Sequence, residues 1–155
     1  KVIVPPPKTL VELEERLAEQ LRSFVGMTTF EELCQEWVLM QARQRKLPFA
    51  VELVGAHWGG NVQVDVAAIN WREKAILLGE AKWQAKSVER SLIRELLEEK
   101  TPKIMSVLPE EGNGWRVYYA FFARNGFTEA AEALAREHHV LLVDLKRLDE
   151  DLSQA

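Results

Sequence analysis

The sequence predicts an α/β fold in which a mixed five-stranded sheet is flanked by helices, in the order α-α-β-β-β-α-β-α-β. The first observation is a pair of apolar runs within residues 61–83, separated by one short polar turn, which indicates a largely buried β-hairpin. The second is that later apolar runs alternate with amphipathic segments, as in strands joined by helices. We therefore expect the first three strands to form an antiparallel meander and helices to join the last two.

The N-terminal part predicts a linker end followed by two helices. Residues 1–8 contain three consecutive prolines, which are typical of a linker. Thr9 to Phe24 carries an apolar stripe at helical spacing, with Thr9 as N-cap and Glu12 completing a capping box. The second helix is expected from Phe30 to Arg43, with Thr28 or Thr29 as its cap.

The rest of the chain predicts five strands and two further helices. The strands are expected at Phe49–His57, at the hairpin runs 62–69 and 75–82, at Trp115–Phe122 and at Val140–Leu145. The helices are expected from Val88 to about Ile104, capped by Ser87, and from Thr128 to His138. Pro102 gives the first of these helices an alternative early end. Lys146 onward is expected to be a polar tail.

Composition limits the class of protein. A chain of 155 residues that is 47% hydrophobic and 28% charged is expected to hold one globular domain. It has no apolar run that could span a membrane and no signal peptide, and its one cysteine, Cys34, excludes an internal disulfide, so the cytoplasm is the expected compartment. The net charge of −4 disfavours nucleic-acid binding unless a local basic face exists. The expected parts are a linker end at 1–8, a connecting helix at 9–25 packed on the domain, and the domain at 26–152.

Three charged residues interrupt the apolar hairpin. They are Asp65 on its first strand and Glu80 and Lys82 on its second. Burying a charge is costly unless the charge is paired or holds a metal. Glu80 and Lys82 are two residues apart and so point to one face, where Asp65 can meet them from the neighbouring strand. Carboxylate oxygens suit Mg²⁺, and a lysine can position or deprotonate an attacking water. The pattern therefore predicts a metal site formed by Asp65 and Glu80, with Lys82 beside it.

Asp65 followed by Glu80-Ala81-Lys82 resembles the PD-(D/E)xK superfamily, which has the restriction endonuclease-like fold. Members carry the aspartate on the second core strand and Glu-x-Lys on the third. The proline of the family pattern is absent, since Val64 precedes Asp65. The resemblance implies a nuclease-like domain with Mg²⁺ or Mn²⁺ as cofactor and nucleic acid, DNA in the first place, as partner. It also implies a glutamate from the first core helix, which Glu31 matches best, with its neighbour Glu32 as the alternative.

A longer pattern resembles one group of proteins more narrowly. The sequence Phe24-Val25-Gly26, the stretch Phe30–Trp37, and the Glu-x-Lys strand ending in Trp83 are similar to the nuclease-like domain of unknown function at the C-terminus of archaeal and some bacterial P-loop ATPases. The resemblance implies that an ATPase domain of a longer chain is a partner. The chain begins with Lys1 and has no Gly-rich Walker loop, so we expect it to be a fragment that does not itself bind ATP by that motif.

Other interpretations of these residues stay open. Asp65 and Lys82 can form an ion pair without function, and Glu31 can belong to a solvated helix face. Three tryptophans near the hairpin can stack on bases, but core or interface positions are favoured for them; these are Trp58, Trp71 and Trp83. Three cations after Glu-x-Lys suit either a phosphate-facing edge or an ordinary helix surface; these are Lys86, Arg90 and Arg94. A non-catalytic docking or nucleic-acid-binding module is the alternative to a nuclease.

Overall fold

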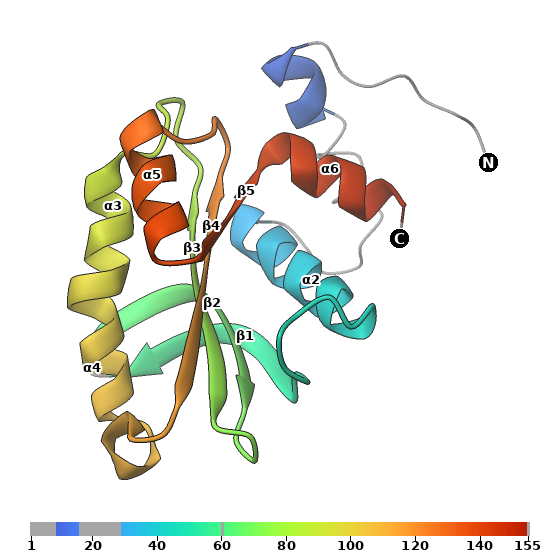
Figure 1. Ribbon diagram of the computed structural model, residues 1–155. Helices are drawn as coiled ribbons and strands as arrows, with labels where there is room; N and C mark the ends of the chain where they lie inside the picture. Colours follow the sequence, from blue (N-terminus) through green and yellow to red (C-terminus); the bar gives the residue numbers. More distant parts are fainter. Residues whose placement is uncertain (1–8, 16–28, 60, 155) are drawn as a thin grey trace.

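The computed structural model describes residues 9–15, 29–59 and 61–154. Its centre is one five-stranded sheet with the strands in chain order (Figure 1). The strands are β1 (Leu53–Gly59), β2 (Val62–Asn70), β3 (Ala75–Lys82), β4 (Arg116–Ala123) and β5 (Val140–Asp144). β1, β2 and β3 pair antiparallel, whereas β4 is parallel to both β3 and β5. The predicted mixed five-stranded sheet, with its meander and its helix-joined strands, is confirmed.

Helices cover both faces of the sheet. They are α2 (Phe30–Arg43), α3 (Arg90–Arg94), the π-helix η1 (Glu95–Lys100), α4 (Thr101–Ser106), the 3-10 turn η2 (Pro109–Gly112), α5 (Glu129–Glu137) and α6 (Leu145–Ser153), and residues 10–15 are also helical. Figure 1 shows α2 and α6 on one side of the sheet, with α3, α4 and α5 on the other. No helix within the described ranges is long and apolar enough to cross a membrane.

The side chains of β3 and β4 alternate between two buried apolar layers. Leu77 and Phe122 pack in the layer under α2 and α6, where Trp37 is also fully buried. Ile76 and Phe121 pack in the opposite layer, under α3 and α5. A strand that is apolar on both faces must be covered on both faces, which explains why the two helical layers are needed.

The C-terminal segment differs from its prediction. Lys146 onward was expected to be a polar tail, but residues from Leu145 to Ser153 form α6. The Asp144 side chain caps this helix by accepting a hydrogen bond from the Arg147 N–H at 2.9 Å. The segment is polar by residue count, yet its few leucines recur at helical spacing and are buried; they are Leu145, Leu148 and Leu152. The number of polar residues was the wrong criterion for predicting a tail, because it ignores the helical spacing of the apolar ones.

The predicted limits of the third helical segment are also corrected. Ser87 does not cap it, because the Ser87 hydroxyl donates to the Asn125 carbonyl at 3.0 Å and the helix begins at Arg90. Pro102 does not end it, because the π-helical turn before it leaves Pro102 in the first turn of α4, where its missing N–H costs nothing. The Thr101 hydroxyl satisfies the Leu96 carbonyl at 2.6 Å.

Other predicted boundaries hold in part. The Thr9 and Thr29 side chains accept hydrogen bonds from N–H groups three residues on, each at 3.1 Å, so both act as N-caps. β1 begins at Leu53 rather than Phe49, because Phe49 leaves the sheet and stacks on Tyr118 with ring centroids 5.5 Å apart. The predicted linker at 1–8 and the predicted helix beyond residue 15 lie outside the described residues.

Gly79 on β3 offers a test of packing at the centre of the sheet. A Cβ there would lie 3.1 Å from the Ala120 carbonyl oxygen and 3.3 Å from Val66 Cβ, whereas a Cβ at Gly55 would meet nothing within 4 Å. Gly79→Val is expected to lower the free energy of unfolding by about 1–3 kcal/mol through overpacking. Gly55→Val, the control in another strand of the same sheet, should leave it nearly unchanged. Urea denaturation of both variants measures the difference, and equal losses would contradict this account of Gly79.

Candidate functional site

Asp65 lies at an irregularity of the sheet. Between Gly55 and His57, β1 advances by two residues while its partners on β2 run from Ala67 to Val64, so β2 contains one extra residue. The alternation of side chains breaks at the same place, because Val64 and Val66 pack in opposite apolar layers. Such bulges redirect the side chains within them. The bulge therefore frees Asp65 from the regular in-and-out pattern of β2.

The strands β2 and β3 separate at Asp65. Their pairing ends with Val66 opposite Gly79, so the next residues outward are Asp65 on β2 and Glu80 on β3. In place of a further backbone ladder bond, the Ala81 N–H donates to Asp65 Oδ2 at 2.9 Å. The Gln35 side chain of α2 donates to the Asp65 backbone carbonyl, also at 2.9 Å. Asp65 is thus fixed from both neighbouring elements, β3 and α2.

Glu80 is the most deeply buried of the predicted site residues, with 4% of its surface exposed. Its Oε1 accepts a hydrogen bond from Lys100 Nζ at 2.5 Å. Lys100 comes from η1 and also donates to the Gln63 backbone carbonyl at 3.2 Å. The sequence analysis did not single out Lys100, although a buried glutamate requires a partner and η1 packs over β2 beside it.

Asp65 and Glu80 share one electrostatic environment. Burial, followed by a side-chain hydrogen bond with Asp65, raises the pKa of Glu80 from its ordinary value of 4.5 to about 7, and Lys100 opposes part of this rise. A carboxyl group with such a pKa keeps its proton up to about neutral pH, and added positive charge nearby would favour its ionised form. The two carboxyl groups thus lie together at the fork where β2 and β3 separate, and Glu80 is only partly ionised at neutral pH.

Glu31 and Lys82 lie around the same pair. Glu31 is an exposed residue in the first turn of α2, and burial and then the Asp65 charge raise its pKa, while the Lys82 charge lowers it. These effects join Glu31, Asp65 and Lys82 in one neighbourhood. Lys82 is half-buried at the end of β3, and within the described parts of the chain it forms no ion pair with Asp65. The alternative of a simple Asp65–Lys82 ion pair is therefore not what the structure contains.

The other candidate side chains are ordinary. Lys86 pairs with Glu89 at 2.8 Å in the loop before α3, and Arg94 pairs with Glu98 at 3.9 Å on the helix surface; both are exposed ion pairs. Cys34 is fully buried, and burial raises the pKa of its thiol well above the ordinary value, so it is a packed core residue rather than a nucleophile.

The carboxylate oxygens of Asp65 and Glu80 are the type of ligand that a hard divalent cation prefers. No cluster of three or more His, Cys, Asp or Glu side chains with metal-binding geometry occurs in the described ranges. Mg²⁺ does not require one, because it is commonly held by one or two carboxylates together with water and substrate phosphate. Asp65 and Glu80 supply two carboxylates, and the raised pKa of Glu80 marks a place where added positive charge would be favourable.

This fold and site define an α/β domain with a carboxylate pair at a strand fork. Residues 6–100, more than half of the chain, match the family DUF234, described as archaeal and bacterial proteins of unknown function, and the chain belongs to that family. No curated protein matches the chain.

Two solved structures are similar to the chain. One is the MspJI restriction endonuclease in complex with a 27-mer oligonucleotide, with a TM-score of 0.46 and 14% identity, over 97% of this chain and 35% of that one. The other is AF1548, a protein of unknown function, with a TM-score of 0.39 and 16% identity, over 72% of this chain and 57% of that one. The chain thus spans about a third and just over half of these proteins, and similarity of this extent assigns neither activity nor ligand.

The raised pKa of Glu80 makes stability depend on pH. Between pH 4.5 and about 7 the folded state keeps a proton that the unfolded state has released, so the free energy of unfolding falls as pH rises through this window. The fall attributable to Glu80 is about 3 kcal/mol. Glu80→Gln cannot ionise, so we expect its stability relative to wild type to increase from pH 5 to pH 8. Denaturant unfolding at both pH values measures this change.

The matched control is Glu110→Gln. Glu110 also pairs with a lysine, Lys74, at 3.3 Å, but it is exposed. Parallel stability profiles for Glu80→Gln and wild type would contradict the assigned environment of Glu80.

Proposed function

We propose that the domain is a metal-dependent nuclease that hydrolyses nucleic-acid phosphodiesters. The observation that carries the proposal is the contact between Asp65 and Glu80 where β2 and β3 separate, with Lys82 two residues further along β3. Buried like charges are costly, and a fold keeps them where a cation or a reaction uses them. The Asp65 and Glu80-Ala81-Lys82 pattern of the PD-(D/E)xK superfamily supports the same reading.

Each residue has a role that its position supports. Asp65 and Glu80 would hold Mg²⁺ or Mn²⁺, which supplies stabilisation of charge on phosphoryl oxygens and acidifies water. The Ala81 N–H fixes the Asp65 carboxylate in place. Lys82 forms no ion pair with a carboxylate in the described part of the chain, so its amino group is available to orient the attacking water as an ammonium or to deprotonate it as a neutral amine. Glu31 assists from α2.

The proposal extends to context. The proposed substrate is nucleic acid, with DNA as the expected kind. The domain works in the cytoplasm as the C-terminal part of a larger P-loop ATPase. The Phe24-Val25-Gly26 sequence and the stretch Phe30–Trp37 support the ATPase connection, because they resemble the domain that follows such ATPases.

One observation favours a second candidate, a docking or nucleic-acid-binding module without catalysis. Lys100 already pairs with Glu80 and opposes part of the rise in its pKa, so the carboxyl pair is partly compensated in the folded chain without a metal ion. The net charge of −4 also weakens the attraction of a free domain for a polyanion. The two candidates differ in whether a divalent cation binds at Asp65 and Glu80.

Metal binding should therefore stabilise the protein. Millimolar Mg²⁺ or Mn²⁺ is expected to raise the melting temperature, because a ligand that binds only the folded state stabilises it. Asp65→Asn should abolish the rise by removing one of the two anionic ligands. Glu110→Gln is the control for loss of a carboxylate away from the fork. A wild-type melting curve that does not change across the titration would count against the metal site.

Catalysis should depend on Lys82. Lys82→Ala is expected to lower the rate of cleavage of single-stranded, duplex or branched DNA by ~10²-fold or more, the scale of losing one acid–base or electrostatic group. Its affinity for DNA should change far less, since one cation among several makes a small part of binding. The control is Lys86→Ala, which removes an exposed lysine four residues further along the chain whose side chain pairs with Glu89. Cleavage by Lys82→Ala at the wild-type rate would rule out the role assigned to Lys82.

A further inference from the structure

Trp83 follows the candidate catalytic lysine directly and is 48% exposed. The Trp83 ring contacts two other side chains at the end of β3. The Phe30 ring lies 5.0 Å away, centroid to centroid, at a tilt of 53°. The Arg124 guanidinium lies over the Trp83 ring, with Cζ 4.9 Å from its centroid. A half-exposed tryptophan is thus held in one orientation by an aromatic ring and a cation.

Arg124 ties this arrangement to the candidate site. Arg124 is the first residue after β4. Its backbone N–H donates to the Lys82 carbonyl at 3.1 Å, so the ends of β3 and β4 lie side by side. Glu14 Oε1 accepts a hydrogen bond from Arg124 Nε at 2.5 Å, which also holds the guanidinium in place. Lys82, Trp83 and Arg124 therefore lie together at the C-terminal ends of β3 and β4, which form one edge of the sheet.

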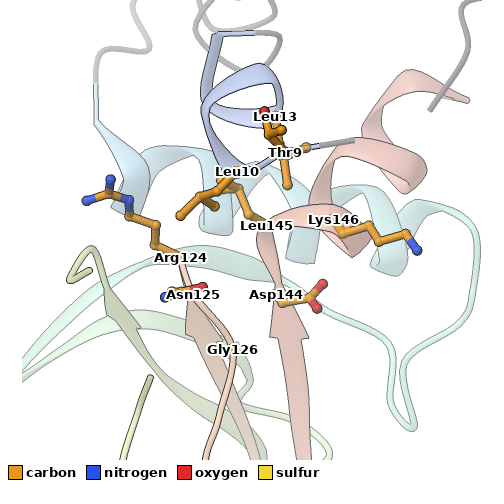
Figure 2. A pocket seen from close by; sticks show the side chains of 9 residues that line it. All are labelled: Thr9, Leu10, Leu13, Arg124, Asn125, Gly126, Asp144, Leu145 and Lys146. Carbon is orange, nitrogen blue, oxygen red and sulfur yellow. The ribbon is translucent and has the colours of Figure 1, made fainter. Parts of the chain in front are cut away.

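The neighbouring cavity does not compete for Arg124. A cavity of about 310 Å³ opens between residues 9–13 and the ends of β4 and β5. Figure 2 shows the Arg124 side chain extending to one side of this cavity, while those of Asp144 and Lys146 extend to the other. The charged groups around the cavity do not converge on a common point within it, so the Arg124 charge belongs with Trp83 rather than with a ligand in the cavity.

We propose that Trp83 is a stacking platform for an unpaired nucleotide base, which lies on the part of the ring that Phe30 and Arg124 leave exposed, and that Arg124 meets the nucleic-acid backbone. The proposal rests on the proposed function, since it names the class of substrate for the same edge. Every base has a π-face, so stacking on an aromatic ring is strong and tolerant of sequence. A base stacked on both sides within a duplex has no face to offer, so the platform selects single-stranded or unpaired nucleotides.

Trp71 supplies a matched control on the same hairpin. It is 50% exposed, and it lies in the turn before β3, at the end of the strand opposite to Trp83. It too rests on an aromatic ring, since Trp115 lies 5.7 Å away in an edge-on arrangement. Trp71 therefore matches Trp83 in residue type, exposure and aromatic support, but it is remote from Lys82 and Arg124.

The experiment measures binding of the full 155-residue chain to fluorescent oligonucleotides by anisotropy, in EDTA so that no cleavage occurs. The probes are a single-stranded oligothymidylate and a blunt duplex. Trp83→Ala is expected to raise Kd for the single strand by roughly tenfold or more, the scale of losing one base–aromatic stack, and to leave duplex binding unchanged. Trp83→Leu, which keeps apolar bulk against Phe30 without a π-face, should show the same loss. Trp83→Phe should retain most of the affinity, and Trp71→Ala should match wild type.

Three results would overturn the platform. They are wild-type affinity in both Trp83→Ala and Trp83→Leu, an equal loss in Trp71→Ala, and no binding of the single strand by wild type at any concentration tested. The proposed function fails separately. A chain that binds single strands through Trp83 but never cleaves DNA in the presence of Mg²⁺ keeps the platform and refutes the nuclease.

Discussion

A buried carboxylate must be compensated, and the arrangement around Glu80 follows from that constraint. β3 is covered on both faces and Glu80 is only 4% exposed, so water alone compensates little of its charge. Compensation comes from Lys100, and only an element packed over that face of the sheet can deliver it. η1 is that element, and its π-helical turn is a type of irregularity that often accompanies functional sites. The candidate site therefore depends on one helix as much as on the Glu-x-Lys strand.

The hairpin and its charges were predictable because their signals are local. Strand alternation and the two-residue spacing of Glu80 and Lys82 are properties of a few consecutive residues. The bulge at Asp65 was not predictable, because it exists only in the register between β1 and β2. Lys100 was missed for a similar reason, since nothing local separates it from the other cations of its helix. Core or interface positions were favoured for the tryptophans, and the exposure of Trp71 and Trp83 excludes the core for these two; this exposure too depends on tertiary packing. The side chain of Trp58 lies outside the described part.

Lys100 also sets the terms on which a cation could bind. An ammonium group at 2.5 Å from a buried carboxylate takes the place of a metal charge, at the cost of desolvating both partners. A divalent ion at the fork must either share Glu80 with Lys100 or displace it. If Lys100 is displaced, its freed charge remains close to the fork, where phosphate oxygens of a substrate would lie. The same contact that stabilises the free chain is therefore compatible with both candidate functions.

A second ion pair at the C-terminal ends of the strands, between Arg124 and Glu14, resembles the Glu80–Lys100 pair with the charges reversed. Glu14 compensates Arg124 as Lys100 compensates Glu80, so the chain has an internal partner both for its candidate metal ligand and for its candidate phosphate contact. Because β3, β4 and β5 run parallel, their carboxyl ends meet at one edge, which is where ligands of such sheets usually bind. If the proposals hold, a nucleic acid at this end of the sheet would compete with Glu14 for Arg124, and a metal ion would compete with Lys100 for Glu80. Each ligand would then release a charge that attracts the other, so each would bind more tightly when the other is already bound.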